Sequence, residues 1–197
     1  MLMISDALYL GRGLHKVAYI HPENENLVIK IPFDPKDAEL RQELSYRKSR
    51  KFRNLDSQLL TKFYGPVETD KGQGYVFERI RNADGTACET LGDYLDAQEA
   101  AGWPDKEEVC ALLQGFMKQV MDERILTNDT CLINFLLQRN EAGEIRIRII
   151  DNVGSPVKIP LVYYWDHMTV GHIRRYLKRL QRDLQEKYGR DLVLVKS

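Results

Sequence analysis

A strongly strand-forming segment at residues 145–150 ends in Asp151, and Gly154 follows three positions later. Its isoleucines are β-branched and predict a strand, because such side chains pack well on a pleated surface. A strand that ends in Asp and then Gly delivers one carboxylate to a fixed point, where it can hold a metal ion. The alternative is an ordinary strand end followed by a turn. The sequence favours a fold that presents this acidic strand end at a site, and Asp151 is its candidate site residue.

A second polar motif precedes this strand. Asp129 and Asn134 lie five positions apart, in a loop between short apolar runs at 125–126 and 135–137 that predict strands. A carboxylate in such a loop can accept a proton from a nucleophile, and an asparagine oxygen is a hard ligand suited to Mg²⁺. The alternative is a turn rich in Asp and Asn, which both residues stabilise by local hydrogen bonds.

Near the start of the chain, Gly11 and Gly13 interrupt a predicted hairpin over residues 8–19. Glycines let backbone N–H groups approach a phosphate closely. The next predicted strand covers 27–31 and carries Lys30, a point charge that can reach the same phosphates. The alternative is an ordinary hairpin with a solvent-facing lysine.

Between these motifs, the first half of the chain alternates strands with one polar helix. The helix is expected to start with Asp34 as its cap and Pro35 at its first position, and to run to about residue 52. Two further strands are expected at 63–68 and 74–80, joined by a turn that contains Asp, Lys and Gly.

The second half of the chain is mainly helical in pattern. Thr90 begins a short helix with a capping-box sequence, and longer helices are expected after Pro104 and over residues 169–188. The polar, glycine-containing segment 81–89 marks the boundary between the halves. This division predicts an N-terminal β-rich lobe over 1–82, with the glycine turn, the strand lysine and one helix, and a C-terminal mainly helical lobe over 83–197, with the catalytic-like loop.

Composition and charge exclude several classes of protein. The 197 residues carry 29 basic and 29 acidic side chains, so the net charge of zero gives no general attraction to nucleic acids or membranes. No apolar run approaches the roughly 18 residues of a membrane span, and the N-terminus lacks the features of a secretory leader. The three cysteines are widely spaced and indicate neither a zinc site nor a disulfide framework. We therefore expect a cytoplasmic protein with no nucleic-acid partner and no membrane span.

The three motifs and the polar helix follow one another in the order found in protein kinases. In that plan, a glutamate of the helix pairs with the strand lysine, and Mg²⁺ ions bind the late aspartate and the loop asparagine. The coincidence of these features in one order predicts an α+β, protein-kinase-like fold with a small β-rich N-lobe and a mainly helical C-lobe. The ligands of such a fold would be ATP and Mg²⁺.

At these same residues the chain resembles one family in particular, the YrbL proteins of the PhoP regulatory network in bacteria. The resemblance covers nearly the whole chain, and its most specific part is Asp-Asn-Val-Gly at 151–154, where kinases at large have Asp-Phe-Gly. The family is usually classed with protein-kinase-like folds and has no settled biochemical activity. Other matching segments are Lys30-Ile31, residues 41–44, residues 65–70, residues 74–76 and Ile133-Asn134.

The resemblance implies a role for each candidate site residue. Gly11 and Gly13 would cover the phosphates of the nucleotide, and Lys30 would hold them. Glu43 would pair with Lys30, with Glu39 as the alternative partner. The other implied roles are a hinge beside the adenine at Glu78 and Ile80, Mg²⁺ ligands at Asn134 and Asp151, and a catalytic set of Asp129, Lys30 and Asp151.

Three departures from the kinase pattern bear on activity. Lys16 stands in place of the third glycine of the phosphate loop, where it can add charge or crowd the phosphates. The His-Arg-Asp triplet is replaced by Thr-Asn-Asp at 127–129, a change around the position of the catalytic base. No Ala-Pro-Glu follows Gly154, so a platform for peptide substrates is not expected. A small molecule, lipid or sugar is therefore at least as plausible an acceptor as a protein.

Two functions remain open from the sequence. The first is an ATP·Mg-binding protein that acts as a phosphotransferase on an unknown small-molecule or protein acceptor. The alternative is a catalytically inactive, pseudokinase-like module that binds nucleotide or a partner in a regulatory role.

Overall fold

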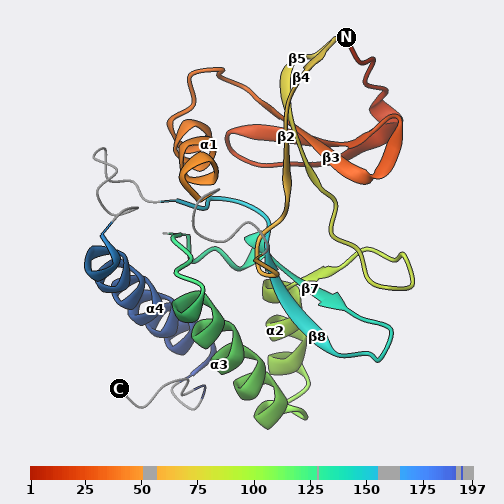
Figure 1. The fold of residues 1–197 in the computed structure, drawn as a ribbon. Helices are drawn as coiled ribbons and strands as arrows, with labels where there is room; N and C mark the ends of the chain where they lie inside the picture. Colours follow the sequence, from red (N-terminus) through yellow and green to blue (C-terminus); the bar gives the residue numbers. More distant parts are fainter. Residues whose placement is uncertain (51–56, 128, 155–164, 190–191, 193–197) are drawn as a thin grey trace.

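The computed structural model describes residues 1–50, 57–127, 129–154, 165–189 and 192, and its elements form two lobes (Figure 1). The first lobe contains η1 (Asp6–Leu8), β1 (Tyr9–Arg12), β2 (Lys16–His21), β3 (Asn24–Pro32), α1 (Ala38–Arg50), β4 (Phe63–Thr69) and β5 (Gly72–Glu78). The second contains β6 (Glu89–Thr90), α2 (Leu91–Ala100), α3 (Lys106–Asp122), η2 (Leu132–Asn134), β7 (Phe135–Arg139), β8 (Ile145–Ile149) and α4 (Asp166–Tyr188). The α+β fold with a β-rich first half and a mainly helical second half is thus confirmed.

The first lobe is built on a five-stranded antiparallel sheet with the order β1-β2-β3-β5-β4. Because side chains alternate between the faces of a strand, one face carries Tyr19, Ile29 and Val76, which form a small buried core with Ile4. The opposite face carries Lys30 and its neighbours toward the second lobe. The sheet therefore has one structural face and one face free for a site.

The second lobe has a larger apolar core, to which α2, α3 and α4 contribute their buried sides. The three-stranded sheet β6-β7-β8 packs against these helices (Figure 1). The short strand β6 was not predicted; it pairs Thr90 with Leu136, directly before the predicted start of α2. Thr90 accepts the N–H of Asp93 at 3.0 Å, as the capping-box sequence predicts.

The helix α1 begins later than predicted, at Ala38, so the assignment of Asp34 as its cap is wrong. The carboxylate of Asp37 caps the helix instead, because it accepts the N–H of Leu40 at 2.8 Å. Asp34 stabilises the preceding turn, where its side chain accepts the N–H of Lys36 at 2.8 Å. The predicted end of this helix near residue 52 lies outside the described residues.

The strand predicted at 125–126 is also wrong. Ile125 and Leu126 are buried in the core of the second lobe, but they belong to no strand. Arg124 has a φ of 56°, and the N–H of Ile125 donates to the carbonyl of Val120 at 2.9 Å. This left-handed turn ends α3 and uses the amide that a strand would need.

The helix α1 also connects the two lobes. Its Tyr46 is 3% exposed and lies in the core of the second lobe, where its hydroxyl accepts the N–H of Leu126 at 3.1 Å. The buried Arg148 of β8 makes a second connection, because it donates to Glu78 at the end of β5 at 2.9 Å. Within the described residues, no helix is both long and apolar enough to cross a membrane.

Candidate functional site

A cavity of about 460 Å³ lies between the lobes and is lined by residues of both. This volume is in the range of small-molecule sites in proteins. The structure brings most of the candidate site residues to this cavity, while Glu43 and Asp129 do not line it. The candidate residues in the lining are Gly11, Gly13, Lys30, Glu78, Ile80, Asn134 and Asp151.

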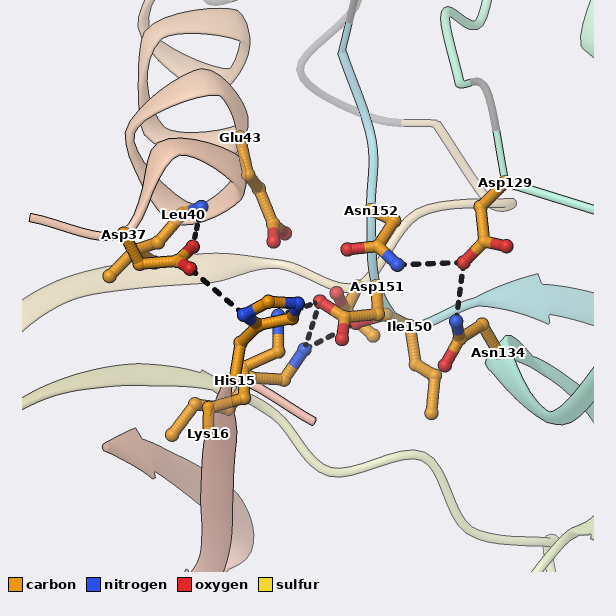
Figure 2. Close-up of polar contacts among 12 residues, drawn as sticks. His15, Lys16, Asp37, Leu40, Glu43, Asp129, Asn134, Ile150, Asp151 and Asn152 are labelled. Carbon is orange, nitrogen blue, oxygen red and sulfur yellow. Dashed lines mark hydrogen bonds and ion pairs between the residues drawn. The ribbon is translucent and has the colours of Figure 1, made fainter. Parts of the chain in front are cut away.

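Asp151 is the charged centre of one end of the cavity, and Figure 2 shows its polar contacts. Its Oδ1 atom accepts from the ammonium of Lys30 at 3.2 Å and also from the ammonium of Lys16. Lys30 donates in addition to the carbonyl of Ile150 at 2.6 Å. Ala18 and Lys30 are cross-strand partners, so Lys30 rises from the middle of the sheet toward the end of β8. Two ammonium groups therefore share one carboxylate.

Burial opposes ionisation of all three groups, and the mutual interactions of the groups outweigh it at Asp151 and Lys16 but not at Lys30. For Asp151, the charges of Lys30 and Lys16 outweigh burial and hold the pKa of the carboxyl well below its usual range. For Lys16, Asp151 and Glu43 outweigh burial and raise the pKa of the ammonium. For Lys30, burial is the largest cause and lowers the pKa, and the charge of Lys16 adds to this effect. Asp151 is thus anionic and Lys16 cationic at neutral pH.

The depressed pKa of Asp151 makes an acid-sensitive contribution to stability. Because the folded pKa lies below the unfolded one, this contribution is fully present above about pH 4 and is lost as the pH falls through the folded pKa. We expect wild type to lose more stability than Asp151→Asn between pH 5 and pH 2.5, as measured by urea unfolding. Equal losses in the two proteins would contradict an ionised, paired Asp151.

Glu43 makes a different ion pair from the one that the kinase plan implies. Its carboxylate accepts from Arg47 at 2.7 and 2.9 Å, and Arg47 also donates to the carbonyl of Thr61 at 2.7 Å. Among the described side chains, the ion-pair partner of Lys30 is Asp151 and not Glu43 or the exposed Glu39. Glu43 still lies close enough for its charge to favour higher pKa values at Lys16 and Lys30.

Asp129 lies at the centre of a second polar network (Figure 2). Its Oδ2 atom accepts from the side-chain amides of Asn134 and, at 2.7 Å, Asn152, and its Oδ1 atom accepts the N–H of Cys131 at 2.7 Å. Because the side-chain nitrogen of Asn134 makes this contact, the side-chain oxygen Oδ1 of Asn134 stays available for a ligand. The carbonyl of Asn152 is held in turn by the buried Thr127 hydroxyl at 2.9 Å. The predicted site does not include Asn152. The sequence signal that could have identified it is Asp-Asn-Val-Gly, in which Asn152 stands where kinases have the Phe of Asp-Phe-Gly.

The expected Mg²⁺ ligands, Asn134 and Asp151, fit a metal ion poorly in this arrangement. Mg²⁺ in nucleotide sites is usually bound by one or two carboxylates together with phosphate oxygens. Here Asp151 is already neutralised by two ammonium groups, and a divalent cation beside them would meet their repulsion. The residues at this end fit ammonium groups better than Mg²⁺.

The other end of the cavity is formed by the segment after β5. The carboxylate of Glu78 is turned to Arg148 and to the N–H of Lys62, at 2.9 and 3.1 Å. Ile80 is 7% exposed, and its backbone N–H has no hydrogen bond to any residue that the structure describes. A buried N–H without a partner is costly unless a ligand or water satisfies it. Apolar side chains line the space between the two ends: Ala18, Val28, Phe77, Ile133 and Leu136.

The chain matches known proteins over nearly its whole length. Residues 2–185 match the model of the family described as PhoP regulatory network protein YrbL. The protein from Escherichia coli K12 named uncharacterized protein YrbL is 31% identical over 99% of this chain and 98% of its own length, and so is its counterpart from Shigella flexneri. Among solved structures, a double mutant of the PknI kinase domain from Mycobacterium tuberculosis aligns with a TM-score of 0.49 and 16% identity. That alignment covers 73% of this chain and 56% of the kinase domain.

Proposed function

The chain belongs to the YrbL family, and we propose that it binds ATP in the cavity between its two lobes. The observation that carries this proposal is the distribution of chemistry along the cavity. Ammonium groups gather at one end, apolar side chains line the middle, and at the other end stands a backbone N–H with no partner among the described residues. A nucleoside triphosphate has the matching sequence of anionic phosphates, a sugar and a flat base with polar edges.

The phosphate end of the proposed complex depends on side-chain charge more than on the glycine turn. The N–H of Gly13 already donates to the carbonyl of Lys16 at 2.9 Å, so this amide is not available to a phosphate. A Cβ added at Gly11 would have no atom within 4 Å, which leaves room for a ligand beside the strand. Lys16 and Lys30 supply the positive charge, since ammonium groups bind phosphates as point charges.

The base end of the proposed complex depends on Ile80 and the apolar lining. The N–H of Ile80 can donate to a ring nitrogen of adenine, which would satisfy a buried donor that has no partner among the described residues. Ala18 and Val28 extend from β2 and β3 on the sheet side, and Leu136 comes from β7 on the opposite side. This gives a flat ring apolar contact on both faces.

Phosphoryl transfer is a second candidate function, and the network around Asp129 favours it. The base of a kinase accepts a proton from the acceptor hydroxyl, and a carboxylate offers about four acceptor positions. Three hydrogen bonds occupy Asp129, two at Oδ2 and one at Oδ1, so one position at Oδ1 remains. Transfer is tested by ADP formation in wild type and in Asp129→Asn. Transfer is supported if wild type forms ADP faster than buffer alone and Asp129→Asn does not. If both proteins form ADP at the rate of buffer alone, nucleotide binding remains as the function.

The binding proposal is tested by thermal unfolding with and without ATP. At about 100 times its Kd, ATP should stabilise the protein by roughly 2.7 kcal/mol, which corresponds to about 5–10 °C in melting temperature for a chain of this size. Ala18→Phe should remove this shift, because the larger side chain fills the space for the base. The matched control is Ala97→Phe, at an exposed position of α2, which should keep the full shift. An unchanged shift in Ala18→Phe would place the nucleotide elsewhere.

A further inference from the structure

The ammonium of Lys16 contacts the carboxylate of Asp151, which the kinase plan assigns to Mg²⁺. Lys16 is the first residue of β2, directly after the glycine turn, and its ammonium contacts Oδ1 of Asp151. The side chains of Lys16 and Asp151 are only 15% and 14% exposed. The contact joins residues that are 135 positions apart and belong to different lobes. The ion pair between Lys16 and Asp151 is therefore a largely buried part of the cavity and not an exposed surface pair.

Contacts of the neighbouring residues hold the backbone at Lys16 in place, which fixes the point from which the Lys16 side chain extends. The carbonyl of His15 accepts the N–H of Phe33 at 2.9 Å, and its imidazole contacts the Asp37 carboxylate at 3.3 Å (Figure 2). Lys16 itself pairs with Pro32 in the sheet register. The turn is thus tied both to β3 and to the start of α1.

The charges around Asp151 favour a tethered ammonium over a free metal ion. Asp151 carries one negative charge and faces Lys16 from β2 and Lys30 from β3, while Glu43 of α1 acts on both ammonium groups from further away. A divalent cation at Asp151 would add two positive charges beside the two lysines that already contact this carboxylate. Adding a polyphosphate anion instead would balance the excess positive charge.

We propose that Lys16 takes the place of the divalent cation at Asp151, so that the cavity binds nucleoside triphosphate without Mg²⁺. The inference rests on the proposed function, because it specifies how that site neutralises the phosphates. An ammonium has three donors, so Lys16 can keep its contact with Asp151 while it donates to a phosphate oxygen. Lys30 supplies the second positive charge at the same oxygen atom, Oδ1 of Asp151.

The test is calorimetric titration of ATP into the full chain, once in EDTA and once in millimolar Mg²⁺. Wild type should bind ATP in EDTA at least as tightly as in Mg²⁺, because the two ammonium groups disfavour a divalent cation carried in with the nucleotide. Lys16→Gln should weaken binding in EDTA by roughly tenfold or more, the expected loss for a charge-assisted hydrogen bond, and Mg²⁺ should restore part of it. Lys16→Arg should keep metal-free binding because it keeps the charge. The matched control, Lys36→Gln, removes an exposed lysine outside the cavity and should bind like wild type.

The outcomes separate this inference from the proposed function. If wild type binds ATP only in Mg²⁺, the role of Lys16 is overturned and the nucleotide site stands. The same conclusion follows if Lys16→Gln binds metal-free ATP as tightly as wild type. Absence of ATP binding by wild type in both buffers would overturn the proposed function, and the inference with it. Melting curves of each variant without nucleotide show whether a change in Kd comes from loss of the fold.

Discussion

Asp151→Asn should lower the free energy of unfolding by about 3 kcal/mol, the usual scale for removing one member of a buried ion pair. Asparagine keeps the shape of the side chain but removes the charge that balances Lys16 and Lys30. Lys30 is 9% exposed, so water can replace only a small part of the lost interaction. Urea unfolding at neutral pH measures the effect.

The variant Lys30→Met provides the control for this prediction. Lys30→Met should cost less than Asp151→Asn, about 1–2 kcal/mol, because the Ile150 carbonyl loses its donor while Lys16 still pairs with Asp151. In the background of Lys30→Met, Asp151→Asn should cost clearly less than in wild type, since one ammonium fewer is left unpaired. If Asp151→Asn alone stays within about 0.5 kcal/mol of wild type, as neutral surface changes do, the ion-pair account is wrong.

Gly154→Ala should destabilise the protein by about 3 kcal/mol, from backbone strain and overpacking together. Gly154 has a φ of +114°, which side chains other than glycine rarely adopt. A Cβ there would also lie 3.0 Å from Cβ of Tyr46 and 3.3 Å from the carbonyl oxygen of Gln42, both on α1. Neither atom is the free end of a flexible side chain, so the helix itself would have to move.

A second glycine separates the two effects. Gly65 has a φ of +119°, and a Cβ added to it would meet nothing within 4 Å. Gly65→Ala should therefore show the strain alone, of order 1–3 kcal/mol, and Gly154→Ala should exceed it by at least about 1 kcal/mol. Thermal or urea unfolding of both variants measures the difference. Equal losses would show that contact with α1 does not constrain the segment after Asp151.

Much of the fold could be predicted from local patterns. The hairpin around the glycine turn, the strand with Lys30 and the acidic end of β8 follow from β-branched runs and glycine positions, and the structure has them. The cap of α1 was misassigned because Asp34 and Asp37 are both good capping residues, and the sequence does not show which of them forms a turn before the helix. The wrong strand at 125–126 has a similar cause, since burial in a core does not by itself distinguish a strand from a helix end.

The partners within the site could be predicted less well, because they join distant parts of the chain. The sequence placed Lys16 near the phosphates but gave no indication that it contacts Asp151. The pairing of Glu43 with Arg47, a helix pair four positions apart, competes with the kinase plan in which Glu43 meets the strand lysine. Arg148 lies in a strand of isoleucines and would be expected to face water, but it is 6% exposed and contacts Glu78.

The most direct measurement is a crystal structure of the wild-type chain with a non-hydrolysable ATP analogue and without divalent cations. We predict the analogue in the cavity between the lobes, with phosphate oxygens at hydrogen-bond distance from the ammonium groups of Lys16 and Lys30. The base should lie among the apolar side chains and accept the N–H of Ile80. An empty cavity at saturating analogue, or an analogue bound at another surface, would contradict the account.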